Sequence, residues 1–142
     1  MKKILLFVFL AFAGISFGQT KTQVDQRLID NQGDEIYNIL TNRKDYYKFL
    51  LWELDNAYQV VSSNGINPQN VLSISSIQDT DGNIFDATKV NDATTFNFIK
   101  YNFIRQKTND VYYDLGNGTL LKFTALKVMW QQFDDSGLNT KQ

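Results

Sequence analysis

The stretch Asp79-Thr80-Asp81-Gly82-Asn83 carries the residue types of a calcium-binding loop. An EF-hand loop needs oxygen ligands at alternate positions, a glycine at its sixth position and a carboxylate at its twelfth. Counted from Asp79, Ile84 takes the place of the glycine and Val90 that of the carboxylate. The motif therefore fails where its geometry is strictest.

A hairpin turn explains the same residues better. Asp81-Gly82 between apolar alternations is a strong signal for a two-residue turn between strands. Asp86 is close enough in the sequence to join Asp79 and Asp81 in a weak cation site, which we keep as the less favoured alternative.

The glycine-rich stretch Gly116-Asn117-Gly118 raises the question of a phosphate site. A phosphate loop must be followed by a helix whose N-terminal amides point at the anion. The residues from Thr119 onward favour a strand instead, so we interpret the stretch as a hairpin loop.

The missing residue types restrict the chemistry further. The sequence contains no histidine and no cysteine, which removes the commonest general base, the commonest zinc ligands and the Ser-His and Cys-His nucleophiles. A pair of carboxylates, as in glycoside hydrolysis, is the catalytic arrangement left. The only glutamates are Glu35 and Glu53, and we assign Glu53 to a solvated helix face. No cofactor is expected.

The aromatic residues point to a binding surface rather than to a catalytic site. Adjacent residues of a strand face opposite sides, so Tyr112 and Tyr113 cannot both enter one core. Tyr113 shares its side with Val111 and Leu115, which predicts a buried Tyr113 and an exposed Tyr112. Trp52 lies outside the apolar stripe of its helix. Exposed tyrosine and tryptophan are favoured in interfaces, so Trp52 and Tyr112 are candidate contacts for a protein or glycan.

The elements that position these residues follow from apolar periodicity. Helical spacing predicts a helix from Val24 that ends near Gly33, then a short helix, then a main helix over 42–56. The later part of the chain reads as strands joined by turns, predicted at 57–62, 71–77, 96–106, 111–115 and 119–130. The residues after Phe133 are polar and predicted to be loose.

Helices followed by consecutive strands indicate an α+β fold. We expect the N-terminal helices to pack on one face of an antiparallel sheet built from consecutive hairpins. A small antiparallel β-barrel is the alternative.

The first 18 residues have the pattern of a cleaved secretory signal. Lys2 and Lys3 precede an apolar run over 4–17 that is too short to span a bilayer, and small residues stand before the expected cleavage after Gly18. The leader resembles those of Bacteroidota envelope proteins, which implies a periplasmic or extracellular protein of a Gram-negative bacterium. The mature chain, 19–142, is expected to form one small α+β domain.

Charge and composition restrict the classes of partner that we expect. The formal net charge is −1, and removal of the leader takes away two lysines, which makes the mature chain more acidic. An acidic chain is not expected to bind nucleic acid or an anionic membrane surface, because both attract positive charge. Without a cysteine, the chain cannot carry a lipoprotein anchor, and we expect no stable membrane anchor after cleavage. The sequence therefore favours an exported, non-catalytic binding module. A small carboxylate-dependent hydrolase and an inhibitor or immunity-type protein are the alternatives.

Overall fold

A computed structural model describes residues 23–91 and 96–139 of the chain. The predicted leader, 1–18, and the expected cleavage site lie outside the described residues. No helix within the described residues is both long enough and apolar enough to cross a membrane.

Three helices open the described chain, as the apolar spacing predicts. They are α1 (Gln26–Gln32), α2 (Glu35–Asn42) and α3 (Lys44–Asn56). The carboxylate of Asp25 caps α1 by accepting a hydrogen bond from the backbone N–H of Arg27. Gly33 ends α1 with a φ of 56°, a conformation that glycine adopts without steric cost.

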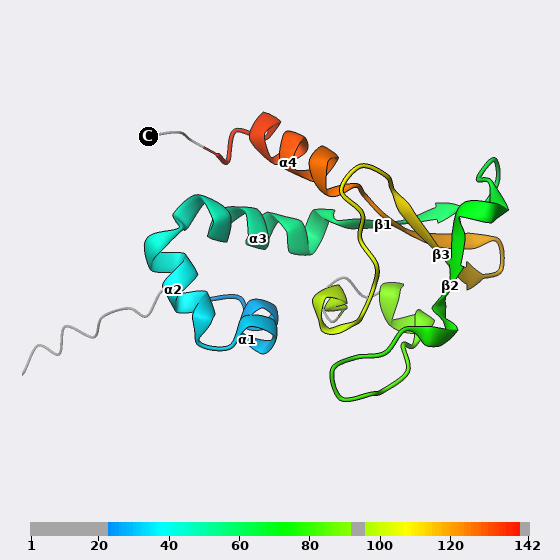
Figure 1. Cartoon of the computed structure of the whole chain (residues 1–142), viewed down its shortest axis with the longest axis horizontal. Coiled ribbons are helices and arrows are strands. Elements are labelled where there is room, and N and C mark those ends of the chain that lie inside the picture. The colour runs from blue at the N-terminus through cyan, green and yellow to red at the C-terminus, as the bar shows by residue number, and fades with distance from the viewer. Residues whose placement is uncertain (1–22, 92–95, 140–142) are drawn as a thin grey trace, which may run out of the picture.

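Four strands form one sheet, in the order β1-β4-β3-β2. The strands are β1 (Tyr58–Ser62), β2 (Val71–Ser73), β3 (Val111–Gly116) and β4 (Thr119–Phe123). β3 and β4 form the hairpin that the glycine-rich stretch predicts, and β1 joins β4 antiparallel. Figure 1 shows α3 leading directly into β1, so that the helices extend from one end of the sheet.

The α+β class is confirmed, but two details of the predicted sheet are wrong. β2 runs parallel to β3, so the sheet is mixed rather than antiparallel, and consecutive strands do not all pair as hairpins. The sheet is also open, which excludes the barrel alternative. A parallel pair needs a long crossover, and the segment from 74 to 110 supplies it.

Over its described residues, 74–91 and 96–110, the crossover segment contains none of the long strands that its alternation predicts. The predicted strand 71–77 ends at Ser73 and continues as a 3-10 turn, and within 96–106 the structure shows a 3-10 turn (Phe98–Lys100) and irregular backbone. The strand pairing that the structure describes in this segment consists of isolated bridges, such as the one between Asp79 and Tyr101. Alternation here reflects rings that enter a core from irregular backbone, not a ladder of strands.

The C-terminal part also differs from its prediction. The predicted strand 119–130 stops at Phe123, and a fourth helix, α4 (Leu126–Asp135), follows where a strand end and a loose tail are predicted. Met129 and Phe133, one helical turn apart, are fully buried. α4 packs along α3, and Figure 1 shows the two side by side.

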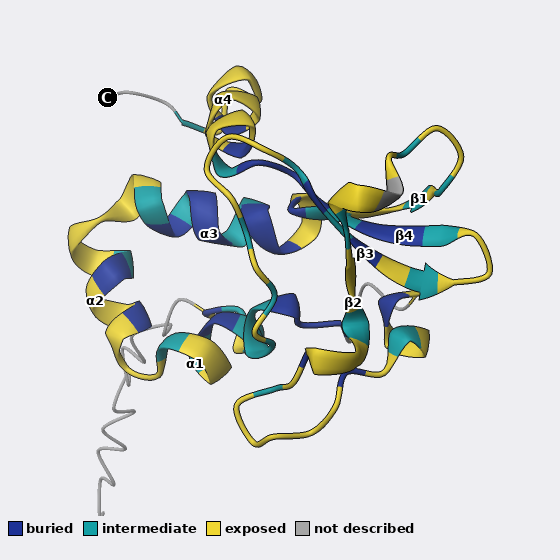
Figure 2. Ribbon diagram, turned by 45° about the vertical axis from the view of Figure 1, so that its right-hand side comes forward, coloured by how far each residue is buried: buried dark blue, intermediate teal, exposed yellow. Residues whose placement is uncertain are grey.

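The buried residues form two clusters. The helical cluster is mostly aliphatic and lies within α1, α2 and α3 and the residues just before them: Val24, Leu28, Ile36, Ile39, Tyr47, Leu50 and Leu54. The sheet cluster is mostly aromatic and joins α3, α4, the crossover segment and the inner sheet face: Phe49, Ala57, Ile77, Phe85, Val90, Phe96, Phe98, Val111, Tyr113, Leu121, Phe123, Met129 and Phe133. Tyr46 and Ile99 pack against both. In Figure 2 many of the buried positions lie on α3, β3 and β4.

Candidate functional site

The acidic turn is closed by its own hydrogen bonds. Asp79 accepts from the backbone N–H groups of Asp81 (3.0 Å) and Asn83 (2.8 Å) and from the Asn83 side-chain amide (2.9 Å). The side-chain bond from Asn83 holds the pKa of Asp79 below its ordinary value. Gly82 has a φ of 83°, and Asp79 and Asn83 bond across Thr80, Asp81 and Gly82. The loop thus has three residues rather than the predicted two, as in a type I turn with a glycine bulge.

Asp86 is engaged separately. Its carboxylate accepts from the hydroxyl (2.7 Å) and backbone N–H (3.0 Å) of Thr88, and the hydroxyl bond lowers the Asp86 pKa. Across residues 23–91 and 96–139, no group of three or more acidic, histidine or cysteine side chains is placed to hold a metal ion.

The two tyrosines of β3 lie on opposite faces of the sheet. Tyr113 is 1% exposed, as predicted, and its hydroxyl accepts a hydrogen bond of 2.7 Å from the backbone N–H of Ile104. Burial raises the pKa of the Tyr113 phenol. Tyr112 is half-buried on the outer face, opposite Lys122 of β4 and Val71 of β2.

Trp52 is half-buried and packs inward. Its ring lies 6.4 Å from that of Phe49 and 5.8 Å from that of Phe133, measured between ring centroids. The structure therefore places Trp52 at the junction of α3 and α4, whereas Tyr112 lies on the outer face of β3 and the acidic turn belongs to the crossover segment. The three predicted groups of site residues do not form one site.

An exposed aromatic surface lies instead where α4 packs along α3. Trp130 is 38% exposed, and its ring lies flat on that of the buried Phe49, with a centroid distance of 3.6 Å and an interplanar angle of 7°. The half-buried Tyr46 continues the arrangement, 6.4 Å from Trp130 and inclined by only 16°. We call Tyr46, Phe49 and Trp130 the aromatic stack.

Charged residues surround the aromatic stack. The guanidinium of Arg43 lies 4.4 Å from the centre of the Tyr46 ring, within the range of a cation–π contact. Lys127 and Asp134 are exposed on α4 at helical spacings that place them beside Trp130. The result is an apolar ring surface with a polar border.

A second group of residues that could bind a ligand or take part in chemistry is the ion pair of Glu53 and Arg105. Glu53 is 6% exposed, so its assignment to a solvated helix face is wrong. Its Oε1 accepts a 2.6 Å bond from Nη1 of Arg105, which joins α3 to the crossover segment. A buried carboxylate needs such a partner, because desolvation without one is costly.

Arg105 is only partly satisfied by this bond. Its Nε and Nη2 are buried and have no hydrogen-bond partner, while its Cζ lies 5.4 Å from the centre of the Phe98 ring. A buried donor without an acceptor costs about 1–3 kcal/mol. An adjacent hollow of about 290 Å³ is lined by Glu53, Arg105 and neighbouring side chains, namely Asn31, Gln32, Tyr46, Leu50, Phe98, Ile99, Tyr101 and Phe103.

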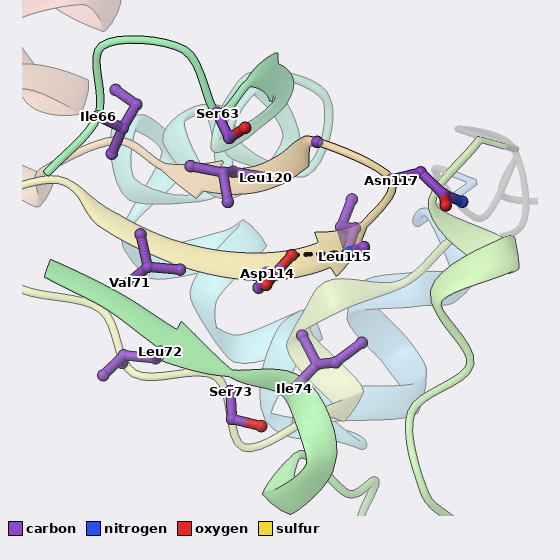
Figure 3. Close-up of a pocket in the computed structure, with 12 residues that line it drawn as sticks. Ser63, Ile66, Val71, Leu72, Ser73, Ile74, Asp114, Leu115, Asn117 and Leu120 are labelled. Carbon is purple, nitrogen blue, oxygen red and sulfur yellow. Dashed lines mark hydrogen bonds between the residues drawn. The ribbon is translucent and has the colours of Figure 1, made fainter. Parts of the chain in front are cut away.

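A larger hollow of about 790 Å³ lies at the hairpin end of the sheet, between β2, β3 and the loop that follows β1 (Figure 3). Asp114, which is paired with Ser73 of β2 and Leu120 of β4, borders this hollow and is the one ionisable side chain among its described lining residues. The Asp114 carboxylate accepts a 2.8 Å bond from the backbone N–H of Gly116. The single carboxylate of Asp114 is occupied by its own turn. It therefore offers a ligand fewer interactions than the Glu53–Arg105 ion pair does.

Sequence reasoning missed Trp130, Glu53 and Arg105 for identifiable reasons. The predicted strand 119–130 includes Trp130, although its neighbours Met129 and Phe133 have helical spacing. Glu53 stands within one turn of the buried Leu50, a spacing that signals a boundary position. Its pairing with a residue 52 positions away leaves no local signal.

Comparison with known proteins identifies no relative. No protein-family model matches the chain, and neither the curated proteins nor the solved structures include a similar one. The interpretation of the site therefore rests on its own geometry.

Proposed function

We propose that the chain is an exported, non-catalytic binding module that engages a partner protein through the aromatic stack. The observation that carries this proposal is the exposed Trp130 ring held flat against the buried Phe49. A ring already fixed in one orientation loses little conformational entropy on binding, so more of its contact energy remains as affinity.

The composition of this surface supports a protein partner. Tryptophan, tyrosine and arginine dominate the residues that contribute most to protein–protein affinity, and Trp130, Tyr46 and Arg43 adjoin one another here. The polar border formed by Lys127 and Asp134 resembles the rim that shields such contacts from water. An inhibitor or immunity-type protein is the special case in which the partner is an enzyme.

The hydrolase alternative has less support. A carboxylate-dependent hydrolase needs two carboxyl groups facing one cleft. Glu53 is the one carboxylate among the described residues that line its hollow, and it is bonded to Arg105. Export rests on the sequence pattern of the leader, and N-terminal sequencing of exported protein should find Gln19 as the first residue.

Affinity capture from the native envelope tests the proposed surface. The mature chain, its Trp130→Ala variant and its Val128→Ala variant are used in parallel, with bound proteins quantified by mass spectrometry. Val128 is the matched control, because it is exposed on α4 (43%) but points to a different side of the helix than Trp130. Near-UV circular dichroism verifies that each variant is folded.

The proposal expects a partner protein that is retained by the wild type and by Val128→Ala but lost with Trp130→Ala. Equal capture by all three would contradict it. A glycan array run with the same variants separates the other partner class, since Trp130-dependent binding to a sugar would replace the protein partner with a glycan.

A further inference from the structure

We infer that the hollow between α3 and the crossover segment is a second binding site, which takes a small monoanionic ligand with a carboxylate on an apolar or aromatic body. This site is separate from the proposed partner surface, although Tyr46 borders both.

The unused edge of Arg105 has the geometry of a carboxylate receptor. Glu53 occupies Nη1, whereas Nε and Nη2 have no acceptor in the described structure. The N–H groups of Nε and Nη2 point in parallel from one edge of the planar group, which matches the two oxygens of a carboxylate. Buried donors without a partner in a native fold require an explanation, and an absent ligand or water supplies one.

The walls of the hollow indicate the body of the ligand. The rings of Phe98, Tyr101 and Phe103 line it together with Tyr46, and its volume is about 290 Å³. Mostly apolar walls with a few polar groups are typical of small-molecule sites, and this volume lies at the lower end of their range. An aromatic acid of about the size of benzoate fits this description.

The local charge selects a monoanion. Glu53 and Arg105 together carry no net charge, so one added carboxylate leaves a single negative charge among them. A dianion such as a phosphate monoester would add a second negative charge close to Glu53, which like-charge repulsion disfavours. A cation would meet the guanidinium, since Glu53 is already paired.

Entry to the site requires local movement. Nε and Nη2 are covered by protein atoms, so a ligand reaches them only when neighbouring side chains shift. The exposed Asn31 and the half-buried Gln32 lie at the end of α1 and form the solvent side of the hollow. Side-chain rearrangement of this kind is common on binding.

The test uses benzoate and its uncharged counterpart benzamide as probes. Each is titrated into the ¹⁵N-labelled mature chain, and the Arg105 Nε–H signal and the backbone amides of 97–106 are followed by NMR. The inference expects saturable shifts with benzoate and at least about tenfold weaker binding of benzamide, which equals about 1.4 kcal/mol. This comparison needs no mutation, so it stands even if a variant fails to fold.

Two arginine variants locate the site. Arg105→Lys keeps the charge but removes the paired donors and should weaken benzoate binding about tenfold or more. Arg27→Lys is the matched control, because Arg27 pairs with Asp25 and Asp55 and does not line the hollow, and it should leave benzoate binding unchanged. Trp130→Ala should also leave it unchanged, so that failure of this site and failure of the partner surface are distinguishable.

Two results would overturn the inference. Equal shifts with benzoate and benzamide would show that the carboxylate is not recognised. Absence of saturable benzoate binding, with a bound water detected at the Arg105 edge, would make the ion pair a purely structural link between α3 and the crossover segment.

Discussion

The helical cluster and the sheet cluster are built by different means. The helical cluster is mostly aliphatic and comes from one continuous stretch, 24–54, whose helices repeat apolar residues at regular spacing. The sheet cluster is mostly aromatic and gathers residues from 49 to 133, many of them on irregular backbone. Large rings can reach one another from backbone segments that lie well apart, and edge-to-face packing tolerates many orientations. Aromatic residues thus hold together a region in which few backbone ladders form.

The helical cluster and the sheet cluster therefore have separate roles. The helical cluster is a local scaffold, whereas the sheet cluster holds the crossover segment against the sheet and supports both the aromatic stack and Arg105. The Glu53–Arg105 pair joins α3 to that segment. Selective perturbation of each cluster should therefore loosen different parts of the molecule.

The largest effect is expected from Phe123→Ala in the sheet cluster. The Phe123 ring lies 4.9 Å from that of Phe103 and 5.6 Å from that of Phe98, between centroids, and is 1% exposed. Its truncation should lower the free energy of unfolding by about 3–5 kcal/mol, as for other buried aromatic residues. Denaturant melts give this value, and hydrogen exchange should show loosening of 96–106 before α1.

Leu28→Ala in the helical cluster is the matched perturbation. It should cost about 2–5 kcal/mol but loosen α1 and α2 first. Identical exchange patterns for Leu28→Ala and Phe123→Ala would mean that the two clusters unfold as one cooperative unit and that the distinction between them has no energetic meaning.

Breaking the Glu53–Arg105 ion pair should have the next largest effect on the free energy of unfolding. Arg105→Met leaves Glu53 buried without its partner and should cost about 3 kcal/mol, the lower end for a broken buried pair because Arg105 keeps some exposure. The double variant Glu53→Leu with Arg105→Met should be less destabilised than Arg105→Met alone. Denaturant melts of the single and double variants measure this, and additive losses would contradict a coupled pair.

A smaller effect is expected from Tyr113→Phe, which removes one hydroxyl from the sheet cluster. The backbone N–H of Ile104 would lose its 2.7 Å acceptor while the ring packing remains. Loss of this part-buried hydrogen bond should cost about 0.5–1.5 kcal/mol. Thermal melts should show the decrease, with the Ile104 amide exchanging faster. An unchanged melting temperature would show that water replaces the hydroxyl.

The smallest effect concerns acid stability at the start of the helical cluster. The hydrogen bond with Arg27 lowers the Asp25 pKa below its ordinary value of 3.8. Because the folded pKa is the lower one, this interaction stabilises the fold above the ordinary value and is lost as the pH falls through the folded pKa. Asp25→Asn keeps an N-cap but not the charge, so its melting temperature should fall less between pH 6 and pH 2.5. An acid response equal to that of the wild type would contradict this contribution.

Much of the fold could be predicted from the sequence where contacts are local. The helical stripes of 24–54 and the hairpin around Gly116 and Gly118 are visible because each depends on residues only a few positions apart. The buried side of β3 followed from the period of two in a strand, which places Tyr113 beside Val111. Both periodicities are properties of the backbone and need no knowledge of distant segments.

The prediction failed where one local pattern suits two structures. The alternation over 96–106 resembles a strand, but a strand requires a neighbour with free N–H and C=O groups, and the segment obtains only an isolated bridge at Tyr101. α4 was missed because its apolar residues directly continue those of β4. In each case the apolar residues were recognised in the sequence, but the backbone conformation that carries them was not.

The sequence by itself determined the α+β class, the helical scaffold, the hairpin and the lack of histidine or cysteine chemistry. Only the tertiary structure decided the parallel pairing of β2 with β3, the stacking of Trp130 on Phe49, and the union of Glu53 with Arg105. These features join residues that are far apart along the chain. Their formation depends on which distant surfaces meet when the core closes, and no local spacing carries that information.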